Sequence, residues 1–413
     1  MCAKAACRHH RLDSRDYDDL PILALSQTDQ PEAISTMILS QLETPCLVLD
    51  EAKLARNVAR MHAHLDQLKV ELRSHVKTAK SIDVTRRVLR SPEGPITVST
   101  LKEAEYFLSH GVRDMLYAVG VTPNKLDHIT DLRRRGALLA LILDNVDTAR
   151  ALAAHACANA DPVPVLIEID CDGHRSGIVP GDPLLIEVGR TLADGGCELR
   201  GVMTHAGASY NCQSVAAIKT MALQERDAVV NSAKALRAAG LPCPVVSVGS
   251  TPTATFADDL TGVTEVRAGV FVFFDLVMAG IGVCAMDDIA LSVLGSVIGH
   301  QREKGWIIVD AGWMALSRDR GTARQKLDQG YGLVCDVHGK PIPDLIMADA
   351  NQEHGVLALR PGSREPLPEL PIGSTVRILP NHACSTAAQH QAYQVVHGED
   401  DAIGATWPRT GGW

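Results

Sequence analysis

The sequence has 413 residues, of which 46% are hydrophobic and 22% charged, a balance typical of a globular protein that buries a large core. Its net charge of -9 provides no basic field for nucleic acid, and no apolar run is long enough to predict a membrane span. The N-terminus does not resemble a signal sequence, so we expect a cytoplasmic protein that binds neither nucleic acid nor membrane.

The first 40 residues are polar and lack periodicity, and we expect them to form an extension outside the folded domains. They contain Cys2, Cys7, His9 and His10, which resemble metal ligands, but no regular element is predicted to hold them together. The 11 cysteines of the chain are scattered and form no CxxC pair. We therefore expect reduced cysteines that mostly pack as small apolar side chains, without a disulfide framework.

Residues 41–287 alternate short apolar runs with helical patterns, which predicts βα repetition. The predicted strands are 70–76, 95–99, 114–119, 138–143, 163–170, 198–205, 243–248 and 263–268. Helical patterns lie between them at 102–110, 147–157 and 225–240, the last of which ends at a glycine. Eight such units predict an α/β fold with a closed parallel (β/α)8 barrel of the TIM type. The chemistry of such barrels lies at the carboxyl ends of the strands.

Residues 288–413 differ in character, because their strand-like runs are not separated by crossover helices. These runs are LSVLGSVIGH, GWIIVDAG, YGLVCDV and STVRILPNHAC. Strands without crossover helices favour antiparallel pairing. We therefore predict a C-terminal, mainly antiparallel β domain.

Lys77 follows the first predicted strand, where an apolar strand interior would desolvate its amine and lower its pKa, as suits a Schiff-base lysine. An ordinary surface lysine is the alternative. Gly249-Ser250-Thr251 after the seventh strand and Gly269 after the eighth supply backbone N–H groups and hydroxyls where barrels bind phosphate. A lysine that faces a phosphate site on a barrel predicts pyridoxal phosphate as the cofactor.

Three further polar residues follow predicted strands. Arg175, after the fifth strand, is a candidate to pair with the cofactor phenolate or with a substrate carboxylate, and a surface ion pair is the alternative. His205 ends the sixth strand and is a candidate acid/base group or a ring that stacks on the cofactor, with a satisfied core histidine as the alternative. Tyr210 lies on the following loop.

His382-Ala383-Cys384 directly follows the strand-like run TVRILP. Residues two apart on an extended chain point to the same side, so both side chains would bind one divalent metal ion, such as zinc, manganese, cobalt or magnesium. As a bare pattern this is a weak signal. The segment 317–324 contains three arginines that are candidates for a subsite binding a second substrate carboxylate, or for surface and dimer-interface ion pairs.

Several of these segments together resemble a known enzyme group. The matching motifs are RSHVKTAKS, EIDCDGHRSG, MTHAGASY, SVGSTPT, EVRAGVFVFFD, DAGWMALSRDRGTARQK, ANQEHG and ILPNHAC. In this order they resemble the D-serine dehydratase and D-threonine aldolase group of pyridoxal-phosphate enzymes, whose barrels are similar to alanine racemase (fold type III). The resemblance covers about residues 43–413.

The resemblance implies roles for individual residues. It implies that Lys77 carries the cofactor and that His382 and Cys384 bind a divalent metal. It implies cofactor contacts at Tyr210, Thr251, Gly269 and Val270. It also implies a homodimer in which the β domain of one subunit approaches the barrel mouth of the other.

The implied activity is dehydration of a small D-β-hydroxy amino acid, with D-threo-3-hydroxyaspartate as the expected substrate and oxaloacetate and ammonia as products. A D-serine dehydratase is one alternative. An aldolase acting on D-threonine or 3-hydroxyaspartate is another, and a racemase and a non-catalytic cofactor carrier are the remaining ones. The racemase would need an opposing acid that the sequence does not identify.

Overall fold

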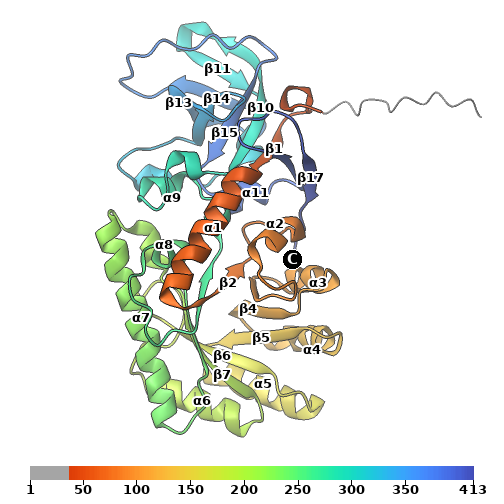
Figure 1. The fold of residues 1–413 in the computed structure, drawn as a ribbon, viewed down its shortest axis with the longest axis vertical. Coiled ribbons are helices and arrows are strands. Elements are labelled where there is room, and N and C mark those ends of the chain that lie inside the picture. Colours follow the sequence, from red (N-terminus) through yellow and green to blue (C-terminus); the bar gives the residue numbers. More distant parts are fainter. Residues whose placement is uncertain (1–36) are drawn as a thin grey trace, which may run out of the picture. The chain divides into compact units, whose positions relative to one another are not determined.

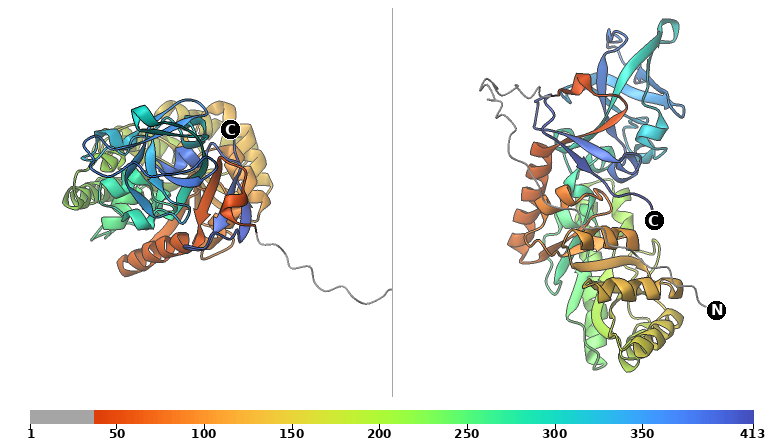
Figure 2. Two further views of the ribbon diagram at one scale, coloured as in Figure 1. Left: turned by 90° about the horizontal axis from the view of Figure 1, so that it is seen from above. Right: turned by 90° about the vertical axis from the view of Figure 1, so that its right-hand side faces the viewer.

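The protein is described by a computed structural model that covers residues 37–413 (Figures 1 and 2). Residues 1–36 of the expected N-terminal extension, with its cysteines and histidines, therefore lie outside the described residues. Residues 37–40, which we had included in the extension, belong to the folded chain. Leu39 is fully buried in the short helix η1 (Leu39–Gln41), and Ile38 forms a bridge with Ala402.

Eight parallel strands close into a barrel, which confirms the predicted α/β fold. The strands are β2 (Glu71–His75), β3 (Ile96–Val98), β4 (Asp114–Gly120), β5 (Leu138–Leu143), β6 (Pro164–Ile169), β7 (Glu198–Thr204), β8 (Val245–Val248) and β9 (Glu265–Ala268). The helices along this part of the chain are α1 (Glu51–Leu68), α2 (Ile82–Val88), α3 (Leu101–Ser109), α4 (Leu126–Arg134), α5 (Val146–Asn159), α6 (Leu184–Asp194), α7 (Val215–Ala238) and α8 (Thr251–Phe256). Each predicted strand overlaps one observed strand.

The barrel interior has an apolar and a polar side. The apolar side is a cluster of one buried side chain from each of four successive strands, Leu116, Ile142, Leu166 and Met203. On the polar side, Arg73 Nε donates to Glu265 Oε2 at 2.8 Å, and Ser247 Oγ donates to Glu265 Oε1 at 2.7 Å. Arg267 Nε donates to Ser247 Oγ at 2.9 Å. Because Arg73 and Glu265 form an ion pair and Arg267 is hydrogen-bonded, these charges are tolerated inside the barrel.

A second, nine-stranded and mainly antiparallel sheet carries the C-terminal part of the chain, as predicted. It contains β10 (Leu291–Gln301), β11 (Trp306–Val309), β12 (Gly332–Cys335), β13 (Pro341–Ala350), β14 (Gly355–Leu359), β15 (Thr375–Pro380), β16 (Ala392–Val396) and β17 (Ala405–Pro408). The short helices of this part are α9 (Leu276–Gly280), α10 (Trp313–Leu316) and α11 (Ala383–Ala387).

The ninth strand of this sheet, β1 (Cys46–Asp50), comes from the other end of the sequence. It pairs antiparallel with β10 and parallel with β16, and Figure 1 shows it beside β10. We had placed residues 46–50 in the barrel domain, but the buried side chains of Leu47, Val48 and Leu49 pack within the sheet. We retain residue 288 as the proposed boundary between the two domains, because β9 is the last barrel strand and β10 follows in the sheet.

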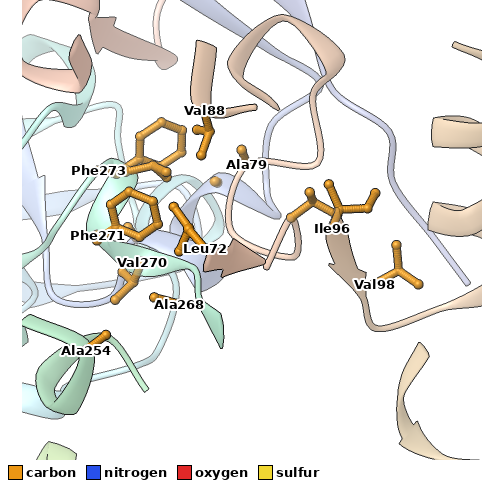
Figure 3. Close-up of a cluster of buried hydrophobic side chains, with 14 of the residues drawn as sticks. Leu72, Ala79, Val88, Ile96, Val98, Ala254, Ala268, Val270, Phe271 and Phe273 are labelled. Atoms are coloured by element: carbon orange, nitrogen blue, oxygen red, sulfur yellow. The ribbon is translucent and has the colours of Figure 1, made fainter. Parts of the chain in front are cut away.

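The turn after β2 is held in the hydrophobic core. Figure 3 shows Phe271 and Phe273, from the segment that follows β9, beside Leu72, Ala79 and Val88. Both phenylalanines are fully buried. The backbone around Lys77 is therefore packed on one side against the end of the last barrel strand.

Within residues 37–413, no helix is long and apolar enough to cross a membrane. The cysteines of the same residues are all free, as expected from their scattered positions.

Candidate functional site

A cavity of about 480 Å³ lies where the carboxyl ends of the barrel strands meet segments of the second sheet. All ten candidate residues from the sequence line this cavity: Lys77, Arg175, His205, Tyr210, Ser250, Thr251, Gly269, Val270, His382 and Cys384. They come from five barrel loops and from the segment after β15. The structure therefore brings together residues up to 307 positions apart in the sequence.

Lys77 lies on the turn that follows β2, between the buried residues Val76 and Thr78. Its own side chain is exposed, so the expected burial of the amine against the strand interior is wrong. Its positive charge acts on His75, His205 and Cys384, where it contributes to lowering the pKa of each side chain. The amine therefore lies within electrostatic reach of both the barrel end and the His382-Cys384 pair.

His205 is a neutral imidazole. Burial lowers its pKa to about 3, and the positive charges of Lys77 and Arg267 act in the same direction. Its Nδ1 lies 2.6 Å from the carbonyl oxygen of Gly249, which can only accept, so Nδ1 carries the proton and Nε2 is an acceptor. This favours a stacking or proton-accepting group over an acid. The ring centroid lies 6.3 Å from that of Tyr210.

Glu225, which our sequence interpretation missed, holds this part of the site in place. Its Oε1 accepts hydrogen bonds from the backbone N–H groups of Ala206 at 2.9 Å and Gly249 at 3.0 Å. Burial raises the pKa of the carboxyl, and these hydrogen bonds oppose the increase. In the sequence Glu225 is one acidic residue in the long helical pattern of α7, so nothing distinguished it.

Ser250 and Thr251 differ in how their hydroxyls are used. Ser250 Oγ caps α8 by accepting from Thr253 N, and it lies 2.8 Å from Ser209 Oγ. Thr251 Oγ1 is buried and has no hydrogen-bond partner in the described structure. A buried hydroxyl without a partner is costly, and an anionic phosphate would satisfy it as an acceptor.

Gly269 packs so closely against the turn after β2 that no side chain fits there. A Cβ atom at this position would lie 2.8 Å from the carbonyl oxygen of His75 and 3.2 Å from Thr78 Oγ1. His75 Nδ1 is also buried without a partner. Two buried, unsatisfied polar atoms on residues that line the cavity, Thr251 Oγ1 and His75 Nδ1, fit the predicted phosphate-bearing cofactor, with Lys77 on the turn after β2.

Arg175 lies on the loop after β6, and its side chain is 58% exposed. One contact holds it, from Nη2 to Glu168 Oε1 at 3.4 Å. The other arginine that lines the cavity, Arg267, is buried and donates to Ser247 and to the carbonyl of Thr204. Arg175 is therefore the less constrained of the two guanidinium groups.

The arginines of segment 317–324 do not line the cavity, which contradicts their candidacy for a carboxylate subsite within this chain. Arg320 forms an ion pair with Asp328 at 2.7 Å, and Arg318 stacks on Trp313 with its Cζ 5.1 Å from the ring centroid. The residues of this segment that reach the cavity are Asp319 and Gly321.

His382 and Cys384 do come together, but not on an extended chain as expected. His382 is the N-cap residue of α11, and Cys384 lies in the first turn of that helix. Asp275 fixes this turn, because its Oδ2 accepts from Ala383 N at 3.0 Å while its Oδ1 accepts from Met278 N at 3.0 Å. One carboxylate therefore links the segment after β9 to the His382-Cys384 pair.

The side chains of the pair are held from two sides. His382 Nδ1 lies 2.7 Å from Asp319 Oδ2, and Cys384 Sγ lies 3.2 Å from Thr78 Oγ1. Burial lowers the pKa of His382, but the hydrogen bonds to Asp319 and Cys384 outweigh burial and raise this pKa in the metal-free chain.

Burial raises the pKa of Cys384, yet the net shift is downward because His382, Lys77 and Thr78 stabilise the thiolate. An imidazole beside a thiolate is a donor set that suits zinc and similar ions. No group of three His, Cys, Asp or Glu side chains arranged for a metal occurs in residues 37–413, so the chain offers this pair with open positions for other ligands.

Comparisons with known proteins match both parts of the chain. Residues 49–277 match the model for the alanine racemase N-terminal domain, and residues 290–396 match a putative serine dehydratase domain. D-threo-3-hydroxyaspartate dehydratase of Delftia sp. (strain HT23) is 55% identical over 378 residues, which cover 91% of this chain and 99% of that protein.

Two further relatives are similar over most of their length. D-serine dehydratase of Dictyostelium discoideum is 28% identical over 90% of this chain and 97% of that protein. A solved structure of a D-threo-3-hydroxyaspartate dehydratase mutant, with cysteine changed to alanine and in the metal-free form, has 54% sequence identity and a TM-score of 0.88. It covers 91% of this chain and 100% of that chain.

Proposed function

The chain belongs to the family with the alanine racemase N-terminal domain, and from this we propose that it is a pyridoxal-phosphate- and divalent-metal-dependent ammonia-lyase that dehydrates D-threo-3-hydroxyaspartate. The observation that carries the proposal is the cavity, which is lined by Lys77, by Thr251 and Gly269, and by the His382-Cys384 pair. The chain is also 55% identical to a D-threo-3-hydroxyaspartate dehydratase. The products would be oxaloacetate and ammonia.

On this proposal, Lys77, Thr251 and Gly269, which line the same cavity, would hold the cofactor. Thr251 Oγ1, which is buried without a partner, would donate to the phosphate, and Gly269 and Val270 would contact the cofactor from the segment after β9. His205 would lie against the ring as a neutral imidazole fixed by Gly249. Pyridoxal phosphate, when bound, supplies an electron sink for the negative charge that develops at the substrate Cα.

Residues of this chain would move the α-proton and hold the metal. The Lys77 amine takes the α-proton, for which its position on a packed turn beside the cavity is suitable. His382 and Cys384 would hold the metal, which would supply Lewis acidity for departure of the β-hydroxyl. The enamine formed by loss of water then hydrolyses to the oxo acid and ammonia.

A substrate with two carboxylates requires a cation beyond those used for the cofactor. Lys77, Arg175 and Arg267 are the lysine and arginine residues that line the cavity among residues 37–413, and Arg267 is already held by Ser247 and Thr204. We therefore assign a substrate carboxylate to Arg175. The weak contact with Glu168 at 3.4 Å leaves its guanidinium available.

A panel of D-β-hydroxy amino acids tests the proposed function. The purified protein, loaded with cofactor and metal, is incubated with D-threo-3-hydroxyaspartate, D-serine and D-threonine, and ammonia, oxaloacetate, pyruvate, glycine and aldehyde are measured. Ammonia and oxaloacetate in equal amounts are expected. Glycine and glyoxylate from 3-hydroxyaspartate would instead identify an aldolase, and pyruvate formed faster than oxaloacetate would identify a D-serine dehydratase.

We also propose that the protein is a homodimer in the cytoplasm. The homodimer rests on the resemblance described above, and light scattering during gel filtration measures it directly. A mass of one chain at micromolar concentration would contradict it.

A further inference from the structure

We propose that Asp319 is the positioning carboxylate of the metal site, which orients His382 so that its Nε2 faces the ion. This inference rests on the proposed metal at His382 and Cys384. It adds a residue that lies outside the His382-Cys384 pair and that acts on the metal through His382.

The contact is short and specific. Asp319 Oδ2 lies 2.7 Å from His382 Nδ1, and both side chains are partly exposed, at 38% and 41%. A carboxylate accepts hydrogen bonds, so Nδ1 is the protonated nitrogen of the pair. The remaining ring nitrogen, Nε2, is then the atom left to bind a metal. Ser385 Oγ, 3.2 Å from the same Nδ1, adds a second contact on this side of the ring.

Asp319 is not placed as a third ligand. No cluster of three potential metal-binding side chains forms in the described part of the chain, although Asp319, His382 and Cys384 all line the same cavity. Asp319 therefore contacts the ring nitrogen away from the ion. A carboxylate in this position fixes the tautomer and the ring orientation and makes the histidine a stronger ligand.

The position of Asp319 is itself built into the fold. It follows α10, and its backbone N–H donates to Ser317 Oγ at 3.2 Å, in a segment where Ser317 has a φ of 106°. This segment and α11 are joined a second time, because Thr386 Oγ1 donates to the carbonyl oxygen of Leu316. The carboxylate and the histidine are thus held by two elements that are themselves fastened together.

The test measures metal affinity directly and does not depend on turnover. The holoenzyme and its variants are stripped of metal, and zinc is titrated against a chromophoric chelator. The cofactor's visible absorption is recorded in parallel. Asp319→Ala should weaken zinc binding about 10- to 100-fold while the cofactor absorption is retained. Asp319→Asn should lose less, because the amide oxygen still accepts from Nδ1.

Glu353→Gln is the matched control, since it removes one negative charge from an exposed residue in the loop between β13 and β14 and should leave zinc affinity unchanged. Zinc affinity of Asp319→Ala within about twofold of the parent overturns the proposal. Where Asp319→Ala does not fold, Asp319→Leu, which is close to aspartate in shape and has no acceptor, replaces it, and a zinc affinity within about twofold of the parent in that variant overturns the proposal. An equal loss in Glu353→Gln also overturns it, because the effect would then be one of overall charge. A parent protein that binds no zinc contradicts the proposed metal site itself, which is a separate outcome.

Discussion

Thr78, the residue directly after Lys77, has its hydroxyl 3.2 Å from the Sγ atom of Cys384. The two residues are separated by 306 positions in the sequence, and they connect the turn of the proposed cofactor lysine to the proposed metal site. Thr78 is fully buried and packed beside Gly269. A shift of the turn that carries Lys77 would therefore change the hydrogen bond to Cys384.

Replacing Thr78 with valine, which has the same shape, should raise the pKa of the Cys384 thiol, because the hydroxyl helps to stabilise the thiolate. In metal-free protein at pH 7, alkylation of Cys384 by iodoacetamide should slow by roughly 3- to 10-fold, as expected for loss of one hydrogen bond that contributes about 0.5–1.5 kcal/mol. Mass spectrometry of the Cys384 peptide gives the rate. An unchanged rate would show that the contact does not stabilise the thiolate.

Lys77→Ala should abolish both the visible absorption of the bound cofactor and ammonia release. Of the lysines in the described residues, Lys77 is the one that lines the cavity. Lys234→Ala, on the exposed face of α7, is the control and should retain both signals. An active Lys77→Ala protein with normal absorption would rule out the assignment.

Removal of the metal with a chelator should stop turnover while the cofactor stays bound. The reason is spatial: the His382-Cys384 pair comes from the segment after β15, whereas the proposed phosphate contacts lie at Thr251 and Gly269. Activity should return on addition of a divalent ion, and absorption spectra before and after chelation measure cofactor occupancy. Full activity in the chelated protein would contradict a metal-dependent step.

Arg175→Ala should discriminate between substrates. If Arg175 binds the second carboxylate, kcat/KM should fall about 10- to 100-fold more for D-threo-3-hydroxyaspartate than for D-serine, since a charged hydrogen bond contributes about 1.5–3 kcal/mol. Equal losses for both substrates would assign Arg175 to the shared α-carboxylate or to the cofactor. Steady-state kinetics with the two substrates makes the comparison.

His205 should remain neutral throughout the physiological pH range, because its pKa is about 3 in the folded protein. In the unfolded chain the His205 imidazole protonates near pH 6.5, whereas in the folded protein it stays neutral. As the pH falls below 6.5, the free energy of unfolding therefore decreases, by about 2 kcal/mol at pH 5. Above pH 6.5 His205 has no effect. The melting temperature of the parent should therefore fall more between pH 7 and pH 5 than that of His205→Gln, and equal decreases would contradict the shift.

The barrel was predictable from the sequence because its signals are local. The strands were predicted from short runs, and the candidate residues of the barrel follow such runs, so the closed parallel barrel and the gathering of these candidates at one end of it could be predicted from the repetition. The motif residues at 175, 205 and 249–251 were found for the same reason, since loops at one end of a parallel barrel must converge.

Three features depended on tertiary structure. The strand Cys46–Asp50 joins a sheet whose other strands begin at residue 291, and no local pattern distinguishes it from a barrel strand. Glu225 and Asp319 contact partners that are distant in the sequence, at Gly249 and at His382. The convergence of His382 and Cys384 was expected from an extended chain, yet it arises from a helical turn that Asp275 fixes through Ala383. The hydrogen bonds of these carboxylates depend on donors that tertiary packing brings close to them. The residues next to each carboxylate in the sequence do not show which donors these will be.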